Sequence, residues 1–160
     1  MRSEQETNEA IERYGDTVRR LCMLHLKHEA DAQDVFQTVF LKYLLHTADF
    51  ESREHEKAWF IRVTINACRD VLKSVFRRRT VSLEAAAELP AQLTDENREV
   101  LRAVRALPPK YREVVYLHYY EGYTAPEIAN ILRKNVNTIY TNLTRAREQL
   151  KTMLGGEEDG

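Results

Sequence analysis

Short hydrogen-bonding side chains gather in the C-terminal part of the chain, with basic residues on both sides of them. The short polar residues are Asn135, Asn137, Thr138, Thr141 and Asn142. The basic residues that flank them are Arg133, Lys134, Arg145 and Arg147. Short amides and hydroxyls can hydrogen-bond base edges or phosphates in the major groove, and basic side chains can hold phosphates. These residue types therefore predict contact with double-stranded DNA.

A helix-turn-helix over Thr124–Leu150 would place these side chains on one exposed helix face. Thr124 can cap the first helix, Pro126 is tolerated in its first turn, and Glu127 completes a capping box. A three-residue turn follows, and the second helix is expected from about Asn135 to Leu154. Apolar residues would lock the two helices together, namely Ile128, Ala129, Leu132, Ile139 and Leu143. The alternative is an ordinary helical hairpin with a solvated polar face.

A second candidate surface lies in residues 57–79, which combine aromatic and basic side chains. They include Trp59, Phe60, Phe76, Arg62, Arg69, Lys73 and the arginines at 77–79. This composition suits single-stranded or melted DNA, where unpaired bases can stack on aromatic rings. For Trp59 or Phe60 taken singly, burial in a core is the better interpretation. Asn66 and Asp70 lie four residues apart on the helix face of the arginines, so this polar stripe could read an extruded base or bind the backbone.

The distribution of charge supports two separate DNA contacts. The chain has a net charge of −1, but residues 57–79 carry +6 and residues 133–151 carry +4. Residues 1–56 carry −5 and residues 80–132 carry −3. Because exposed charges are screened beyond about 10 Å, each basic segment attracts phosphate locally. Two basic segments therefore predict two contacts, each on its own module.

No group of residues indicates catalysis or metal binding. The five histidines lack metal-ligand spacing, and the sequence has neither a glycine-rich phosphate loop nor a nucleophile motif. Asp31 and Asp34 are better explained as a helix N-terminus than as an acid–base pair. We therefore expect no enzyme activity, no metal and no cofactor. Cys22 and Cys68 are expected to be reduced, semi-buried thiols of a cytoplasmic protein, and no apolar run reaches the roughly 20 residues of a membrane span.

Helical periodicity dominates the sequence and predicts an all-α protein of two small helical domains joined by a flexible linker. Helices are expected over about 8–28, 30 or 31 to 44, 54–76, 95–107, 111–120, 124–133 and 135–154. The first domain is then 1–79, the linker 80–95, the second domain 96–154 and an acidic tail 155–160. A short apolar helix within the linker is an alternative.

Three segments resemble the extracytoplasmic-function (ECF) group of bacterial RNA polymerase sigma factors. The family's helix that docks on the clamp of the polymerase largest subunit resembles DAQDVFQTVFLKYL (Asp31–Leu44). Its helix that binds and melts the minus-ten element resembles WFIRVTINACRDVLKSVFRRR (Trp59–Arg79). Its minus-thirty-five domain resembles LPPKYREVVYLHYYEGYTAPEIANIL and NTIYTNLTRAREQL, both within Leu107–Leu150. The resemblance implies a region 2-like bundle and a region 4-like helix-turn-helix, in a protein that directs core polymerase to promoters.

The resemblance also implies roles for individual residues. Core polymerase binding falls on Asp34, Gln37, Phe40 and Leu41. Minus-ten binding falls on Phe50, Ser52, Arg53, Trp59, Arg62, Asn66, Arg69, Asp70 and Lys73, with the first three in a loop that pockets a flipped base. Minus-thirty-five binding falls on Arg133, Lys134, Asn135, Asn137, Thr138, Tyr140, Thr141, Asn142 and Arg145. Glu84 and Glu88 suit a linker that occupies the RNA path. The implied partners are the polymerase clamp and flap, single- and double-stranded promoter DNA, and an anti-sigma factor.

The sequence departs from the family pattern at a few positions. Arg133-Lys134 stand where Gly and an apolar residue are common, and Thr38 stands where Glu is usual. Tyr140 and Asn142 stand where the family often has basic residues in the recognition helix. The resemblance therefore does not specify which minus-thirty-five DNA sequence this protein binds. The alternative function is a free-standing helix-turn-helix regulator, which would normally dimerise on two half-sites. A helical nuclease is a third hypothesis, but it lacks a metal or nucleophile constellation.

Overall fold

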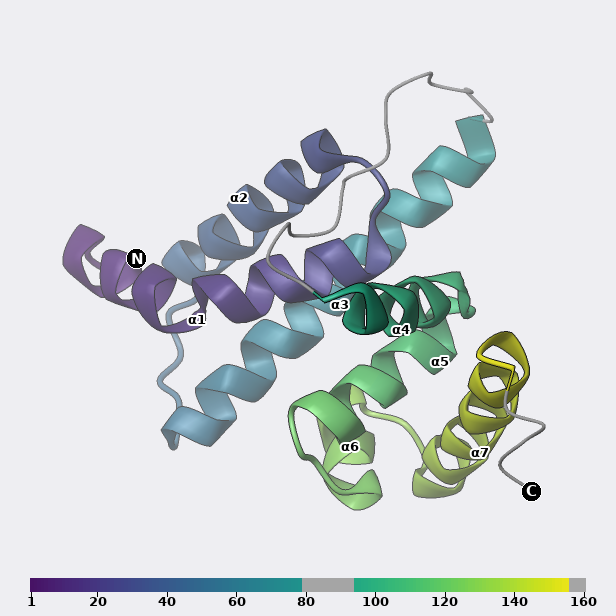
Figure 1. Cartoon of the computed structure of the whole chain (residues 1–160). Helices are drawn as coiled ribbons and strands as arrows, with labels where there is room; N and C mark the ends of the chain where they lie inside the picture. Colours follow the sequence, from purple (N-terminus) through teal and green to yellow (C-terminus); the bar gives the residue numbers. More distant parts are fainter. Residues whose placement is uncertain (79–93, 156–160) are drawn as a thin grey trace. The chain divides into compact units, whose positions relative to one another are not determined.

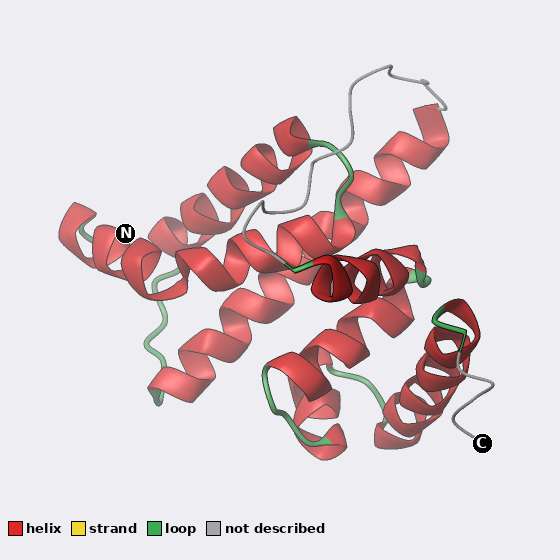
Figure 2. Cartoon of the chain, viewed as in Figure 1, coloured by secondary structure: helices red, strands yellow, loops and turns green. Residues whose placement is uncertain are grey.

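The computed structural model describes residues 1–78 and 94–155, with side chains to residue 74 in the first stretch. Both stretches consist of helices and connecting loops (Figure 2). They belong to two compact units, here called the first and second unit. The prediction of two small helical domains is confirmed. Most of the predicted linker, with Glu84 and Glu88, lies outside the described residues, as do the arginine at 79 and the tail beyond residue 155.

The first unit contains α1 (Glu4–His25), α2 (Glu29–Leu45) and α3 (Arg53–Arg78), each packed against the other two (Figure 1). Apolar residues at helical spacing form its core, where Val18, Val39 and Phe60 are fully buried. Helix α1 begins at Glu4 rather than near residue 8 because Ser3 caps it. The Ser3 hydroxyl accepts a hydrogen bond from the Glu6 backbone N–H at 3.0 Å.

A buried carboxylate joins the three helices of the first unit. Glu56 of α3 accepts hydrogen bonds from the Tyr14 hydroxyl of α1 at 2.8 Å and the Tyr43 hydroxyl of α2 at 2.9 Å. Arg13 adds an ion pair to Glu56 at 3.7 Å. Burial and the bond to Glu56 raise the pKa of Tyr43 to about 12, and the same two causes raise the pKa of Tyr14. Both hydroxyls therefore stay protonated to a higher pH than an ordinary tyrosine, and they tie the start of α3 to its neighbours.

The second unit contains α4 (Asp95–Ala106), α5 (Pro109–Val115), the π-helical turn η1 (Tyr116–Tyr120), α6 (Ala125–Leu132) and α7 (Val136–Met153). Helices α5 and α6 both pack on α7, and Leu117, Ile128, Ile139 and Ala146 are fully buried. The single α-helix expected over 111–120 is divided, because α5 ends at Val115 and η1 continues it. The Glu121 N–H bonds to the Tyr116 carbonyl at 3.1 Å, five residues back, as π-helical geometry requires.

Candidate nucleic-acid interface

The predicted helix-turn-helix is formed by α6, the turn at 133–135 and α7. Its capping box is confirmed: the Thr124 hydroxyl accepts from the Glu127 N–H at 3.3 Å, and the Glu127 carboxylate accepts from the Thr124 N–H at 2.9 Å. Arg133 ends α6 in the left-handed conformation, with φ 57° and ψ 50°. The Lys134 N–H then bonds to the Ala129 carbonyl at 2.9 Å, as in a Schellman turn. This positive φ explains why glycine suits position 133, since glycine adopts it without a Cβ penalty.

The first turns of α7 present a polar face, called the recognition face below. Its exposed residues are Asn137, Thr138, Tyr140, Thr141 and Arg145. Asn135 caps the helix, and its side-chain oxygen accepts from the Asn137 N–H at 2.8 Å. That oxygen is therefore engaged in starting the helix that carries the recognition face.

Asn142 does not lie on the recognition face, and the exposure expected for it is wrong. It is only 6% exposed. Residue 142 follows Ile139 by three positions and precedes Leu143, so it shares the side of α7 that packs into the core. The sequence pattern missed this because Asn142 sits at the border between the buried and exposed sides.

An aromatic residue of η1 supports one of the predicted phosphate-binding cations. The Arg147 guanidinium lies over the Tyr119 ring, 5.8 Å from its centroid, and Nε donates a hydrogen bond to the Tyr119 hydroxyl. Tyr119 is itself 58% exposed, so the pair stands at the surface of the second unit. The π-helical turn thus restricts the freedom of a cation that follows the recognition face on α7.

Two arginines and a lysine in the middle of α3 share one side of that helix. Arg62, Asn66, Arg69 and Lys73 are spaced by four, three and four residues, and Asp70 lies beside them. These five residues are called the α3 polar face. Asn66, Asp70 and Lys73 are exposed, and the two arginines are half-buried. The opposite side of α3 carries Phe60, Ala67 and Cys68 into the core, which fixes the direction of the polar face.

Four aromatic rings meet where α2 passes into α3, and they are called the loop cluster. Its members are His46, Phe50, His55 and Trp59. Phe50 stacks on His46 with centroids 5.1 Å apart, meets His55 edge-on at 5.3 Å and lies 5.8 Å from Trp59. Phe50 is half-buried, whereas His55 is exposed. Sequence reasoning missed both histidines because it tested them only as metal ligands.

Trp59 places one ring of the loop cluster on the same side of α3 as the α3 polar face. Trp59 packs on Tyr43 and Phe60 and is 8% exposed, which confirms core burial as the better interpretation for this ring. Arg62 follows Trp59 by three residues, on the next turn of the helix. The Ser52 hydroxyl accepts from the His55 N–H at 3.1 Å, so Ser52 caps α3, and Arg53 is the exposed first residue of that helix. The loop cluster and the α3 polar face, which the resemblance assigns to the same minus-ten strand, are therefore consecutive along α3.

Helix α2 carries an exposed face of different character. Asp34, Gln37 and Leu41 are exposed, Leu41 at 55%, and Leu45 continues this face at 59%. Phe40 belongs to the other side of the helix. It is 5% exposed, with its ring centroid 5.2 Å from that of Phe60. Of the four residues expected to bind core polymerase, three are therefore at the surface, and Phe40 is buried in the core.

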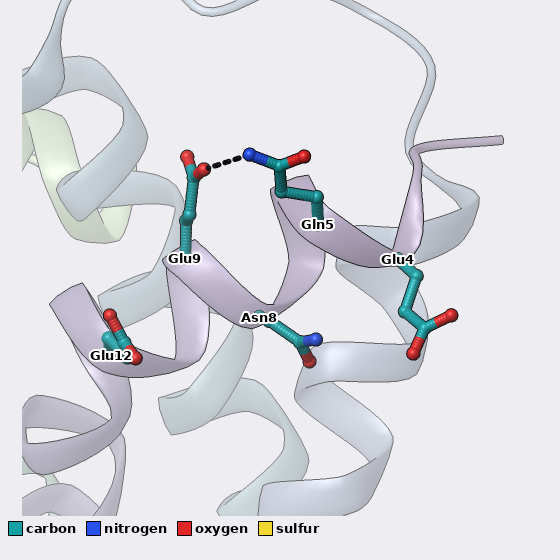
Figure 3. Close-up of a pocket in the computed structure, with 5 residues that line it drawn as sticks. All are labelled: Glu4, Gln5, Asn8, Glu9 and Glu12. Carbon is teal, nitrogen blue, oxygen red and sulfur yellow. Dashed lines mark hydrogen bonds between the residues drawn. The ribbon is translucent and has the colours of Figure 1, made fainter.

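A shallow depression on α1 has no feature of an active site. Its cavity volume is about 420 Å³, and it is lined by Glu4, Gln5, Asn8, Glu9 and Glu12 (Figure 3). The Gln5 side-chain nitrogen donates to the Glu9 carboxylate at 3.1 Å. These side chains project from one helix face, and their three carboxylates repel phosphate. This side of the first unit is therefore unsuited to DNA.

The parts of the chain that the structure describes contain no cluster of three or more His, Cys, Asp or Glu residues that could hold a metal ion. Cys22 and Cys68 are buried free thiols. Among residues 1–78 and 94–155, no helix is long and apolar enough to cross a membrane.

Two family models match the chain, one for each unit. Sigma-70 region 2 matches residues 10–80, and Sigma-70 region 4 matches residues 97–150. The chain is 27% identical over 141 residues to the RNA polymerase sigma factor SigV of Bacillus subtilis, covering 87% of this chain and 85% of SigV. It is 26% identical over 160 residues to the ECF RNA polymerase sigma factor SigE of Mycolicibacterium smegmatis, covering 92% of this chain and 61% of SigE.

A solved structure shares the fold. The sigma factor RpoE of Bartonella quintana, crystallised with the anti-sigma factor NepR, superposes with a TM-score of 0.79 at 21% identity, over 96% of this chain and 99% of that one. Regions 2 and 4 together, in that order, define an RNA polymerase sigma factor. The chain belongs to the ECF group of these proteins. It is thus not an enzyme but a subunit that works with RNA polymerase at promoters.

Proposed function

We propose that the two units divide promoter recognition between them. The loop cluster and the α3 polar face bind the melted minus-ten strand, and the recognition face binds the minus-thirty-five duplex. The functional modules are residues 1–79 and 96–154, joined by 80–95, and the protein acts in the cytoplasm. The single observation that carries the proposal is that the loop cluster and the α3 polar face are consecutive along α3, because this brings aromatic rings and cations together on neighbouring turns of one helix.

The minus-ten assignment rests on the chemistry of these side chains. Unpaired bases stack on aromatic rings, and their phosphates bind cations. Phe50 and its histidine neighbours supply rings at one end, and Arg62, Arg69 and Lys73 supply positive charge along the helix. Exposed Asn66 supplies an amide that can hydrogen-bond the edge of an extruded base. Ser52 and Arg53 contribute at the start of α3, and buried Trp59 contributes by holding Phe50 in place.

The minus-thirty-five assignment rests on the helix-turn-helix geometry. The second helix of such a motif enters the major groove with the residues near its N-terminus on the base edges. Asn137, Thr138 and Thr141 stand there, and Tyr140 offers an apolar and hydroxyl surface beside them. Arg133, Lys134 and Arg145 are placed to hold phosphates on either side, with Asn135 starting the helix. Asn142 acts from the buried side by packing.

Helix α2 is the proposed contact with core polymerase, through Asp34, Gln37 and Leu41 on the clamp of the largest subunit. The exposed leucines at 41 and 45 support this contact. They lie one helical turn apart on the surface, where two large apolar side chains can pack against a helix of a partner protein. We propose that the second unit of this chain contacts the flap of the second-largest polymerase subunit. An anti-sigma factor is a further proposed partner, supported by the fold shared with RpoE bound to NepR and with CnrH bound to the cytosolic domain of CnrY.

The proposal is tested by run-off transcription with native-host core polymerase on a library of genomic fragments. We expect new start sites and a complex with core, with little tight promoter binding by the protein alone. Nanomolar duplex binding without polymerase would favour a free-standing regulator. Absence of both new start sites and a core complex would refute the sigma assignment.

Substitutions then separate the two surfaces. Arg62→Ala or Asn66→Ala should reduce strand opening, measured by permanganate reactivity, more than closed-complex formation. Asn137→Ala or Thr141→Ala should do the reverse, measured by gel shift. Asn8→Ala and Asn97→Ala remove exposed asparagines from α1 and α4 and serve as matched controls. Equal effects of all four interface variants on both steps would contradict the division of labour.

A further inference from the structure

Arg2, which precedes α1, makes contacts far from its place in the sequence. Its backbone N–H donates to the Leu44 carbonyl at 2.9 Å, at the end of α2. Its guanidinium donates to the Ala48 carbonyl at 2.8 Å, in the loop between α2 and α3. The side chain is only 12% exposed and forms an ion pair with Glu6 at 3.4 Å. Arg2 belongs to none of the sequence motifs, yet its hydrogen bonds attach it to the loop between α2 and α3.

The same guanidinium contacts two aromatic rings. Its central carbon lies 4.5 Å from the centroid of Tyr43 and 5.3 Å from that of Phe50. The two rings are nearly parallel, with an interplanar angle of 8°, so the cation lies over both. Such cation–π contacts strengthen as the pair loses water, and this guanidinium is largely covered. Arg2 thus fixes both the backbone of the loop at Ala48 and the ring of Phe50.

We propose that Arg2 is a positioning residue for capture of the minus-ten strand, acting through Phe50. The inference rests on the proposed function of the loop cluster. Thr47, Ala48 and Asp49 are exposed and non-helical, so their order depends on such contacts. A loop that is ordered before the strand arrives avoids an entropy cost on binding. Arg2 does not touch DNA, because its guanidinium is engaged with Ala48, Glu6 and the two rings.

The test uses holoenzyme and a fluorescent single-stranded oligonucleotide carrying the minus-ten element of a promoter that the wild-type holoenzyme opens. Arg2→Ala should weaken binding of this oligonucleotide about tenfold, which corresponds to about 1.4 kcal/mol. Arg2→Gln retains an amide donor for Ala48 and should lose less. Arg19→Ala is the matched control, because Arg19 also stacks on a ring, Phe36 at 4.7 Å, and pairs with Asp16, away from the loop. It should change binding less than about twofold.

Three measurements distinguish positioning from other roles. The dependence of affinity on salt should keep its wild-type slope, whereas a lost phosphate contact would reduce that slope by about 0.7. Affinity for core polymerase should be unchanged in both Arg2 variants, whereas equal loss of core and strand binding would show a role in folding alone. In a Phe50→Ala background, Arg2→Ala should add little further loss.

The proposal is overturned by a reduced salt slope, by loss of core affinity in both variants, by additivity with Phe50→Ala, or by an Arg2→Ala effect equal to that of Arg19→Ala. Each of these outcomes leaves the sigma function intact. If the wild-type holoenzyme opens no promoter, or opens one without binding the oligonucleotide of its minus-ten element, the proposed minus-ten function fails first.

Discussion

Removal of the Glu56 carboxylate should destabilise the first unit more than any exposed substitution on α3. Glu56→Ala takes the acceptor from two buried hydroxyls, those of Tyr14 and Tyr43, at 2.8 and 2.9 Å. Hydrogen bonds to a charged group contribute about 1.5–3 kcal/mol each, and a buried donor left without a partner costs about 1–3 kcal/mol. Part of the loss is offset because a carboxylate no longer has to be desolvated. We expect a net loss of about 3 kcal/mol in the free energy of unfolding.

Urea denaturation followed by tryptophan fluorescence measures the stability of the first unit, because the fluorescent residue lies there. Trp59 is the one tryptophan of the sequence, and it packs on Tyr43 with centroids 6.0 Å apart. With an m-value of about 1.5 kcal/mol/M, the midpoint should fall by about 2 M. Glu54→Ala, an exposed carboxylate of the same first turn, is the control and should cost about 0.5 kcal/mol through the helix dipole.

Tyrosine variants test the mechanism of the Glu56 effect. Tyr43→Phe should destabilise the wild-type protein, because it removes one bond to Glu56. In the Glu56→Ala background the same change should be neutral or stabilising, because it removes a hydroxyl that has lost its acceptor. A Glu56→Ala midpoint within experimental error of Glu54→Ala, or additive tyrosine effects, would refute the reasoning.

Two further predictions concern the turn of the helix-turn-helix and alkaline pH. Arg133→Gly should stabilise the second unit by about 1 kcal/mol, because glycine adopts the positive φ of 57° without strain, while it weakens binding to the minus-thirty-five duplex. Hydrogen exchange of the α6 and α7 amides measures the stability change, and unaltered or faster exchange would contradict it. Above pH 10 the first unit should lose stability as the pH rises toward 12, because an unfolded tyrosine ionises near 10 whereas the folded pKa of Tyr43 is about 12. Trp59 fluorescence in urea at pH 8 to 11.5 tests this, and an equally steep decline in Tyr14→Phe/Tyr43→Phe would show that other groups cause it.

Local sequence signals predicted much of the second unit. The capping box at Thr124 and Glu127 and the buried stripe through Ile139 and Leu143 are present as expected, and α6 ends at Leu132, one residue before the expected end. These signals act between residues three or four positions apart, so a linear pattern contains them. The pattern missed two features, namely the π-helical turn after Val115 and the burial of Asn142 at the border between the two sides of α7.

In the first unit, the sequence predicted the helices but not all of their contacts. Helical periodicity placed α2 and α3 correctly and oriented the α3 polar face away from the core. The family resemblance grouped Phe40, which packs inward on Phe60, with its exposed neighbours Gln37 and Leu41. Helical periodicity assigned no role to His46, because the partner ring of this residue lies in a loop whose path the pattern does not specify.

The sequence by itself determined the helical class, the two basic segments, the helix-turn-helix and membership of the ECF group. Those properties follow from residue types and spacings that are local or shared with relatives. Only the tertiary structure decided that Glu56 binds tyrosines 42 and 13 residues away, and that Arg2 reaches a loop 46 residues along the chain. The physical reason is that such contacts depend on how helices pack, and packing brings together side chains whose separation in sequence carries no periodic signal.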